Sequence, residues 1–270
     1  MQVNLNGIGL LGPGLCGWPE SQQILLGKNI YDKEMLPKPF PSILQPNELR
    51  RSSEVVRWSL RAAEEAMRQA QLKPDALATV FASSGGETEI LHKICLALNT
   101  SERAISPTLF HHSVHNASAG YWSIGVQSQL PSSSLSCYDS SFCGGLIEAA
   151  TFVCSHQTPV LLVAYDIPPP PPLYAARPLS GPFAVAFVMS PAPLPQSFSI
   201  LKIGILDEGA GTVSTMKDPG LEMLRDGNPA ARALPVLTAI ASGGPAALFL
   251  NYLDNLLLSV DVMPCQPCPN

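Results

Sequence analysis

The stretch SCYDSSFCGGLIEAA, residues 136–150, predicts a strand that ends in a sharp turn and continues as an apolar helix. From Phe142 to Cys154 the helix carries one charge, Glu148, and such a helix is typically buried on nearly all sides. Partial positive charge gathers at a helix N-terminus and lowers the pKa of a thiol there. The turn therefore suits a cysteine nucleophile.

The sequence around this elbow alternates apolar strands with helices. An amphipathic helix is predicted over residues 52–72, capped by Ser52 or Ser53, because small and apolar residues recur at helical spacing. A second helix is expected over residues 87–99, and one or two more over 219–243. Such alternation indicates an α/β fold with a central, partly parallel sheet. The first predicted strand lies within residues 1–14 and enters a glycine-rich turn. The other predicted strands are 78–84, 135–139, 159–166, 181–191, 197–208 and 256–264.

The proline run in DIPPPPPLYAARPLS, residues 166–180, predicts a surface loop, since consecutive prolines join neither a helix nor a central strand. The run could also be a polyproline ligand for an aromatic groove, but a stiff connector needs no partner.

Composition limits the function classes. Charged residues make up 14% of the 270 residues, which is low for a soluble domain and hints at a surface hidden against a permanent partner. The net charge of −5 leaves no basic stripe for nucleic acid. The longest apolar run, residues 246–260, is broken by Asn251, Asp254 and Asn255, so no membrane span is expected. With no signal peptide predicted, a cytoplasmic location is expected.

Other candidate sites are weak. The seven cysteines are scattered through apolar segments, as in a reducing compartment. The three histidines His111, His112 and His115 lack partners at metal-ligand spacing, so no metal is expected. CQPC at 265–268 has redox spacing but lies in a terminal tail. The glycine turns at 82–89 and 208–212 match no phosphate-binding pattern, and no cofactor is expected.

Two ordered motifs carry a resemblance to a known family. YDSSFCGGLIEAA resembles the nucleophile turn D-T-A-C-S-S-S-L of β-ketoacyl synthases, with Asp139 on the leading Asp and Leu146 on the closing Leu. SPTLFHHSVHNASAGYWSI, residues 106–124, is similar to the S-P…V-N-x-x-A-G-x-x-S-I segment of the same family. The resemblance implies a thiolase-like α/β fold, essentially its N-terminal half. Residues 1–190 would form the synthase-like domain and 191–270 a divergent C-terminal extension packed on it.

The chain departs from the family at the residues that do chemistry. The resemblance places Phe142 on the nucleophilic cysteine, and phenylalanine cannot carry an acyl chain. Family members also use two histidines far downstream to stabilise an enolate, whereas the only histidine after Phe142 is His156. Cys143 lies one residue on, about 100° round the helix, and is interpreted as a buried structural residue.

The pattern resembles the chain-length factors of heterodimeric ketosynthases, in particular those of aryl polyene clusters. It implies a non-catalytic subunit that pairs with a full-length β-ketoacyl synthase, is visited by an acyl carrier protein and shapes the acyl tunnel. The alternative is a small acyltransferase or thioesterase that uses Cys143. The resemblance implies that the strand in SSLSCYD, residues 133–139, is the sheet edge at which the two subunits pair. The implied interface and tunnel residues are Thr108, Leu109, Phe110, Asn116, Leu135 and Cys137.

Overall fold

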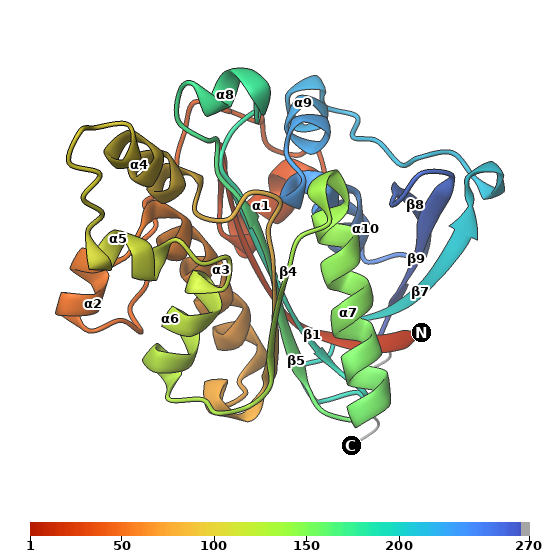
Figure 1. Cartoon of the computed structure of the whole chain (residues 1–270). Coiled ribbons are helices and arrows are strands. Elements are labelled where there is room, and N and C mark those ends of the chain that lie inside the picture. The colour runs from red at the N-terminus through yellow and green to blue at the C-terminus, as the bar shows by residue number, and fades with distance from the viewer. Residues whose placement is uncertain (266–270) are drawn as a thin grey trace.

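The computed structural model describes residues 1–265, which form a mixed α/β structure around one sheet (Figure 1). The strands lie in the order β4-β3-β5-β6-β1-β7-β9-β8, with the short β2 paired to β1. Strands β4, β3 and β5 are parallel, and the remaining neighbours are antiparallel. The bounds are β1 Gln2–Gly12, β2 Leu15–Cys16, β3 Ala78–Ala82, β4 Ser132–Leu135, β5 Val160–Asp166, β6 Phe183–Ser190, β7 Ser199–Asp207, β8 Ala246–Asn251 and β9 Leu256–Pro264.

Helices cover both faces of the sheet. Helices α3 and α6 pack on one face, and α7 packs on the other beside α1 and α10 (Figure 1). The helices are α1 Trp18–Leu25, α2 Pro46–Arg51, α3 Glu54–Ala70, α4 Thr88–Leu98, α5 Pro107–His112, α6 Ala117–Val126, α7 Ser141–His156, α8 Leu173–Ala176, α9 Pro219–Gly227 and α10 Leu234–Ser242. Four 3-10 turns are η1 Pro74–Ala76, η2 Tyr138–Ser140, η3 Glu208–Ala210 and η4 Ala230–Ala233.

Alternate residues of the central strands pack into two hydrophobic cores, one on each face of the sheet. In β5, Leu162 packs in the core on the α7 side, whereas Leu161 and Val163 pack in the core on the α3 side. Both sets are buried, as expected for strands covered on both faces by helices. These strands are uninterrupted apolar runs in the sequence because both of their faces are buried.

The predicted helix over residues 52–72 is confirmed as α3. Ser53 is the N-cap, since its Oγ accepts a hydrogen bond from the backbone N–H of Val56 at 3.1 Å. The helix lies so close to β1 that a Cβ on Gly9 would fall 1.8 Å from the carbonyl oxygen of Ala62. Glycine is required there because any side chain would clash with backbone. Contact between helix and strand thus fixes the α3 layer against the sheet.

The C-terminal residues add three strands to the same sheet. β7 pairs with the first residues of β1, and β9 and β8 follow outwards. Strands β7 and β9 were predicted, whereas β8 was not, because its residues and β9 form one apolar run in the sequence. The turn between them, residues 252–255, includes Asn255 with φ +64°.

The prediction of a buried strand over residues 135–139 is wrong. Strand β4 ends at Leu135, is only partly buried and forms the outermost strand of the sheet on that side. The chain then bends, because Tyr138 has φ +52° and the hydroxyl of Ser141 donates a hydrogen bond to the carbonyl oxygen of Tyr138 at 2.7 Å. Leu135 therefore lies on the edge strand and Cys137 beyond it.

The proline run leaves β5 and reaches the short helix α8 on the surface, as predicted for a connector, and residues 171–176 are exposed. None of the helices in the described residues is long and apolar enough to cross a membrane. Only Cys265 of the CQPC stretch lies within the described part of the chain.

Candidate functional site

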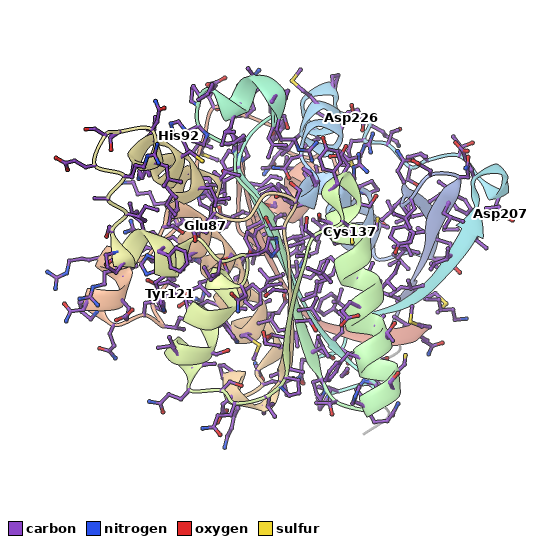
Figure 2. All side chains as sticks on the ribbon, in the orientation of Figure 1. Glu87, His92, Tyr121, Cys137, Asp207 and Asp226 are labelled. Carbon is purple, nitrogen blue, oxygen red and sulfur yellow. The ribbon has the colours of Figure 1, made fainter. Side chains whose placement is uncertain are left out.

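The elbow between β4 and α7 is a hydrogen-bonded turn. Cys137 donates its backbone N–H to Ser141 Oγ at 3.1 Å, and Ser140 donates its own to the carbonyl oxygen of Cys137 at 2.9 Å. The turn delivers the chain into α7, whose first six residues are buried. Figure 2 shows Cys137 beside the start of α7. The predicted turn and buried helix are therefore present, whereas the strand before them ends at Leu135 and does not extend over the predicted residues 136–139.

Phe142 lies in the second position of α7, with its side chain 0% exposed. Its ring packs edge-on against Phe187 of β6, with ring centroids 6.1 Å apart and an angle of 80° between the planes. This is a favourable aromatic geometry inside a close-packed core. The position that the family resemblance assigns to a nucleophile is thus a hydrophobic packing position here.

Cys143 is also buried, and its thiol donates a hydrogen bond to the backbone carbonyl oxygen of Asn251 at 3.3 Å. Burial raises the pKa of this thiol to about 12, although Arg232 nearby acts in the opposite direction. The thiol is therefore protonated at neutral pH, and a protonated thiol is a poor nucleophile.

The β8–β9 turn closes the elbow from outside. Besides the Asn251 carbonyl that meets Cys143, the carbonyl oxygen of Tyr252 accepts a hydrogen bond from Ser140 Oγ. These contacts join residues more than 100 positions apart in the sequence. The backbone of the turn thus occupies the approach to the elbow.

Asp139 keeps its place in the turn and is held by arginine. Its carboxylate pairs with Arg177, and Arg232 Nη2 lies 3.8 Å from its other oxygen. Beside it is an open hollow of about 1000 Å³ that extends to the β8–β9 turn. Cys137 and Tyr138 line this hollow.

The histidines lie away from the elbow. His156 ends α7 and stacks on Phe152, with centroids 4.1 Å apart. His112 Nε2 shares a hydrogen bond with Tyr121 Oη at 3.0 Å, and His115 Nε2 lies 3.0 Å from the carbonyl oxygen of Ser83. Within residues 1–265, no group of three or more His, Cys, Asp or Glu side chains could hold a metal ion.

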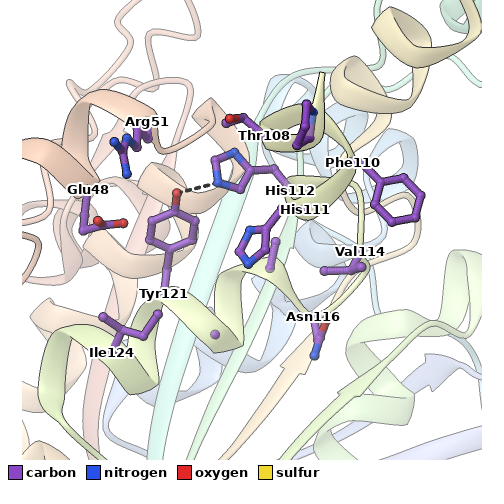
Figure 3. Close-up of a pocket in the computed structure, with 13 residues that line it drawn as sticks. Glu48, Arg51, Thr108, Phe110, His111, His112, Val114, Asn116, Tyr121 and Ile124 are labelled. Carbon is purple, nitrogen blue, oxygen red and sulfur yellow. Dashed lines mark hydrogen bonds between the residues drawn. The ribbon is translucent and has the colours of Figure 1, made fainter. Parts of the chain in front are cut away.

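A second hollow, of about 910 Å³, lies between α2, α5 and α6 (Figure 3). It brings together three of the predicted interface residues, Thr108, Phe110 and Asn116. Leu109 is half-buried on the same helix and does not line it, while Leu135 and Cys137 lie at the end of β4. The predicted residues therefore fall into two groups, one on α5 and α6 and one at the edge strand.

Exposed apolar side chains surround the α5 group. Phe110 is 68% exposed, and Val114 and Ile124, which line the same hollow, are also largely exposed. Helix α4 is apolar on most of its surface, yet Ile90 is its one buried residue. Large exposed apolar areas mark interaction surfaces. The sequence predicted helix α4 but not its exposure, because exposure depends on which other elements pack against the helix. The exposed leucines of α4 are Leu91, Leu96 and Leu98.

Two buried carboxylates lie beneath the loop that follows β3. Asp166 Oδ1 accepts hydrogen bonds from the backbone N–H of Ser84 at 2.8 Å and from the hydroxyls of Ser83 and Ser84. Glu87 is 3% exposed and accepts a hydrogen bond from Ser53 Oγ at 2.5 Å. Burial raises the pKa of Asp166 to about 6 and that of Glu87 to about 7. No motif or spacing in the sequence predicted either carboxylate.

Glu87 makes folding stability depend on pH. Its pKa rises on folding from about 4.5 to about 7, so the folded state binds more protons than the unfolded state between these values. The free energy of unfolding should therefore fall by about 3 kcal/mol as pH rises through this window. Glu87→Gln should remove this part of the loss, as measured by urea unfolding at pH 5 and pH 8. Glu102→Gln, at an exposed site outside the helices, is the control; equal pH dependence in wild type and Glu87→Gln would contradict the assignment.

The comparisons with known proteins agree with this architecture. A family model described as "Beta-ketoacyl synthase, N-terminal domain" matches residues 28–221. No curated protein matches the sequence.

Among solved structures, the chain is similar to a ketosynthase (ApeO) in complex with its chain length factor (ApeC) from Xenorhabdus doucetiae. The TM-score is 0.72 at 24% identity, over 96% of this chain and 99% of that chain. It is also similar to the ishigamide ketosynthase/chain length factor, with TM-score 0.70 at 12% identity over 98% and 100% of the two chains. A third similar structure is AntDE:AntF, a type II PKS acyl-carrier protein in complex with its ketosynthase, with TM-score 0.71 at 14% identity over 98% and 99%.

These likenesses confirm the predicted thiolase-like α/β fold with its central mixed sheet. The family match covers well over half of the chain and includes both motifs singled out in the sequence. The chain therefore belongs to the β-ketoacyl synthase N-terminal domain family.

Proposed function

We propose that this chain is a non-catalytic chain-length factor that pairs with an active, full-length β-ketoacyl synthase and shapes its acyl tunnel. The observation that carries the proposal is Phe142, fully buried against Phe187 where the family holds its nucleophile. Two of the similar solved structures are named as ketosynthases with their chain length factors, which supports the choice of partner. The pathway class we propose is polyene or polyketide synthesis of the aryl polyene kind, or one that resembles fatty-acid synthesis.

The elbow lacks what acyl transfer needs. A condensing enzyme carries its acyl chain on a thiolate, and the Cys143 thiol is buried, protonated and bonded to Asn251. Decarboxylation of a malonyl unit also requires groups that stabilise an enolate. The sequence has no histidine beyond His156, which stacks on Phe152 at the opposite end of α7. The alternative, an acyltransferase or thioesterase that uses Cys143, therefore has no observation in its favour.

The edge strand β4 offers a surface for the partner. Thr79 donates its N–H to the carbonyl oxygen of Pro131, and Ser83 donates its own to that of Leu135. Because bonds alternate along a parallel strand, the N–H and C=O groups of Ser132 and Ser134 point away from β3. An edge without a charge, a proline or a bulge is ready to pair with another strand. We propose that the synthase pairs there, with Leu135 and Cys137 at the interface.

The exposed apolar surface of α4 and α5 fits the same partner. We propose that Thr108, Leu109, Phe110 and Asn116 face the synthase and border the far end of its acyl tunnel. An acyl carrier protein would bind the complex, as a type II PKS acyl-carrier protein is in complex with its ketosynthase in the solved structure named above. In this proposal residues 1–190 form the synthase-like part and 191–270 the divergent extension that closes the elbow. Co-purification of the chain with a full-length synthase at one to one tests the assignment.

Leu109 should tune product length. Each methylene that the growing chain buries is stabilised by roughly 0.8 kcal/mol, so a side chain that blocks the tunnel end removes this gain and adds a steric cost. Leu109→Trp and Leu109→Phe should shorten the partner's products, and Leu109→Ala and Leu109→Gly should lengthen them. Mass spectrometry of carrier-bound products from the reconstituted complex measures the distribution.

Ile205→Trp is the matched control, since Ile205 is exposed on β7, five strands away from β4 in the sheet order. It should leave the products unchanged. An unaltered distribution in all four Leu109 variants, with the complex intact, would remove this residue from the mechanism.

A further inference from the structure

Tyr138 is held in an uncommon conformation in the elbow turn. Its φ of +52° lies in the left-handed region, which bulky residues rarely adopt. Its side chain is nevertheless 63% exposed, so burial of the ring does not compensate for the backbone conformation. Such conformations persist where the surroundings impose them, and they cluster at functional sites.

Neighbouring groups fix the backbone and the ring of Tyr138 separately. Ser141 Oγ donates a hydrogen bond to the carbonyl oxygen of Tyr138 at 2.7 Å. The guanidinium carbon of Arg177 lies 3.9 Å from the centroid of the ring, and the same guanidinium pairs with Asp139. The arginine thus lies against the ring while it binds a carboxylate. An aromatic side chain fixed in this way loses little conformational entropy when a partner binds it.

The position of Tyr138 links it to the edge strand. It follows Leu135, the last residue of β4, by three residues and lines the hollow beside the β8–β9 turn. The exposed ring therefore lies within three residues of the strand edge that we propose for the partner. Tyrosine and arginine are also the residue types that most often dominate binding energy at protein interfaces.

We propose that the elbow has become a recognition element, in which Tyr138, fixed by Arg177 and Asp139, anchors the β-ketoacyl synthase beside the β4 edge. The identity of the partner rests on the proposed function. The anchoring role rests on the exposure, the backbone conformation and the arginine contact of Tyr138 itself.

The test uses the chain co-expressed with a full-length β-ketoacyl synthase from the same source, and the complex is measured by sedimentation velocity over a dilution series. Tyr138→Ala should raise the Kd at least about tenfold. Tyr138→Gly should raise it equally while the melting temperature stays the same or increases, because glycine adopts the left-handed conformation freely. Tyr138→Phe, which keeps the ring, should bind nearly as wild type does.

A double-mutant cycle and a control separate recognition from folding. Arg177→Ala should weaken binding on its own but cause little further loss in a Tyr138→Ala background, because it acts through the ring. Ile205→Ala on β7 should leave the Kd unchanged. If Tyr138→Gly binds like wild type while Ser134→Pro on the β4 edge abolishes the complex, the anchoring role of Tyr138 is wrong and the proposed function stands. If the wild-type chain forms no complex, both fail.

Discussion

Phe142→Cys restores the family's nucleophile to the elbow, and we expect the variant to show no condensing activity. The new thiol would lie in the core against Phe187, as buried as the neighbouring Cys143, and would stay protonated for the same reason. The histidines that stabilise an enolate would still be missing. Loss of a buried aromatic ring should also lower the free energy of unfolding by about 3 kcal/mol.

Two assays measure these effects. Release of carbon dioxide from a malonyl thioester reports decarboxylation, and urea unfolding reports stability. Phe142→Leu, which keeps most of the apolar volume, is the control and should cost only about 1 kcal/mol. Turnover of malonyl thioester by Phe142→Cys with no synthase present would overturn the interpretation that the elbow is inactive.

The second large effect should come from the sheet edge. Ser134→Pro removes an N–H that points away from β3, so the bonds between β3 and β4 remain while the free edge loses a donor and gains a bulky ring. We expect the one-to-one complex with the synthase to be lost in co-purification. The chain without its synthase should self-associate, since its exposed apolar surface is large for its low charge content.

The sheet supplies its own control at the opposite edge. In β8, the backbone N–H of Phe249 donates a hydrogen bond to Ser214 Oγ, and its carbonyl oxygen accepts one from the N–H of Ser214. Both groups of Phe249 therefore point away from β9. Because the bonds alternate along the strand, the N–H of Ala247 also points away from β9. Ala247→Pro is thus the same change at the other edge and should leave the complex intact. Equal loss in both variants would indicate a folding defect, and retention of the complex by Ser134→Pro would exclude β4 as the interface.

Much of the fold could be predicted because its signals are local. Ser53 and the spacing of small residues that follow it identify α3, and uninterrupted apolar runs identify β5 and β6. The elbow was recognisable from its strand, turn and apolar helix together. The missed strand, β8, lies in the same apolar run as β9. Asp254 and Asn255 interrupt this run at the turn, but they were interpreted only as evidence against a membrane span.

The site depended on contacts between distant residues. The family resemblance placed Phe142 on the nucleophile position, but the sequence could not show that the carbonyl of Asn251 accepts a hydrogen bond from Cys143 across 108 positions. It also predicted a strand through Cys137, whereas the left-handed Tyr138 bends the chain and exposes its ring. Exposure of the α4 leucines likewise follows from packing rather than from the helical pattern.

The most direct test of a non-catalytic subunit is the intact mass of each chain after the purified complex meets an acyl thioester. If the proposal is correct, the acyl group is found on the synthase subunit alone, and this chain keeps its unmodified mass while the complex elongates with malonyl units. A covalent acyl adduct on this chain, or identical products from the synthase without it, would contradict the proposal.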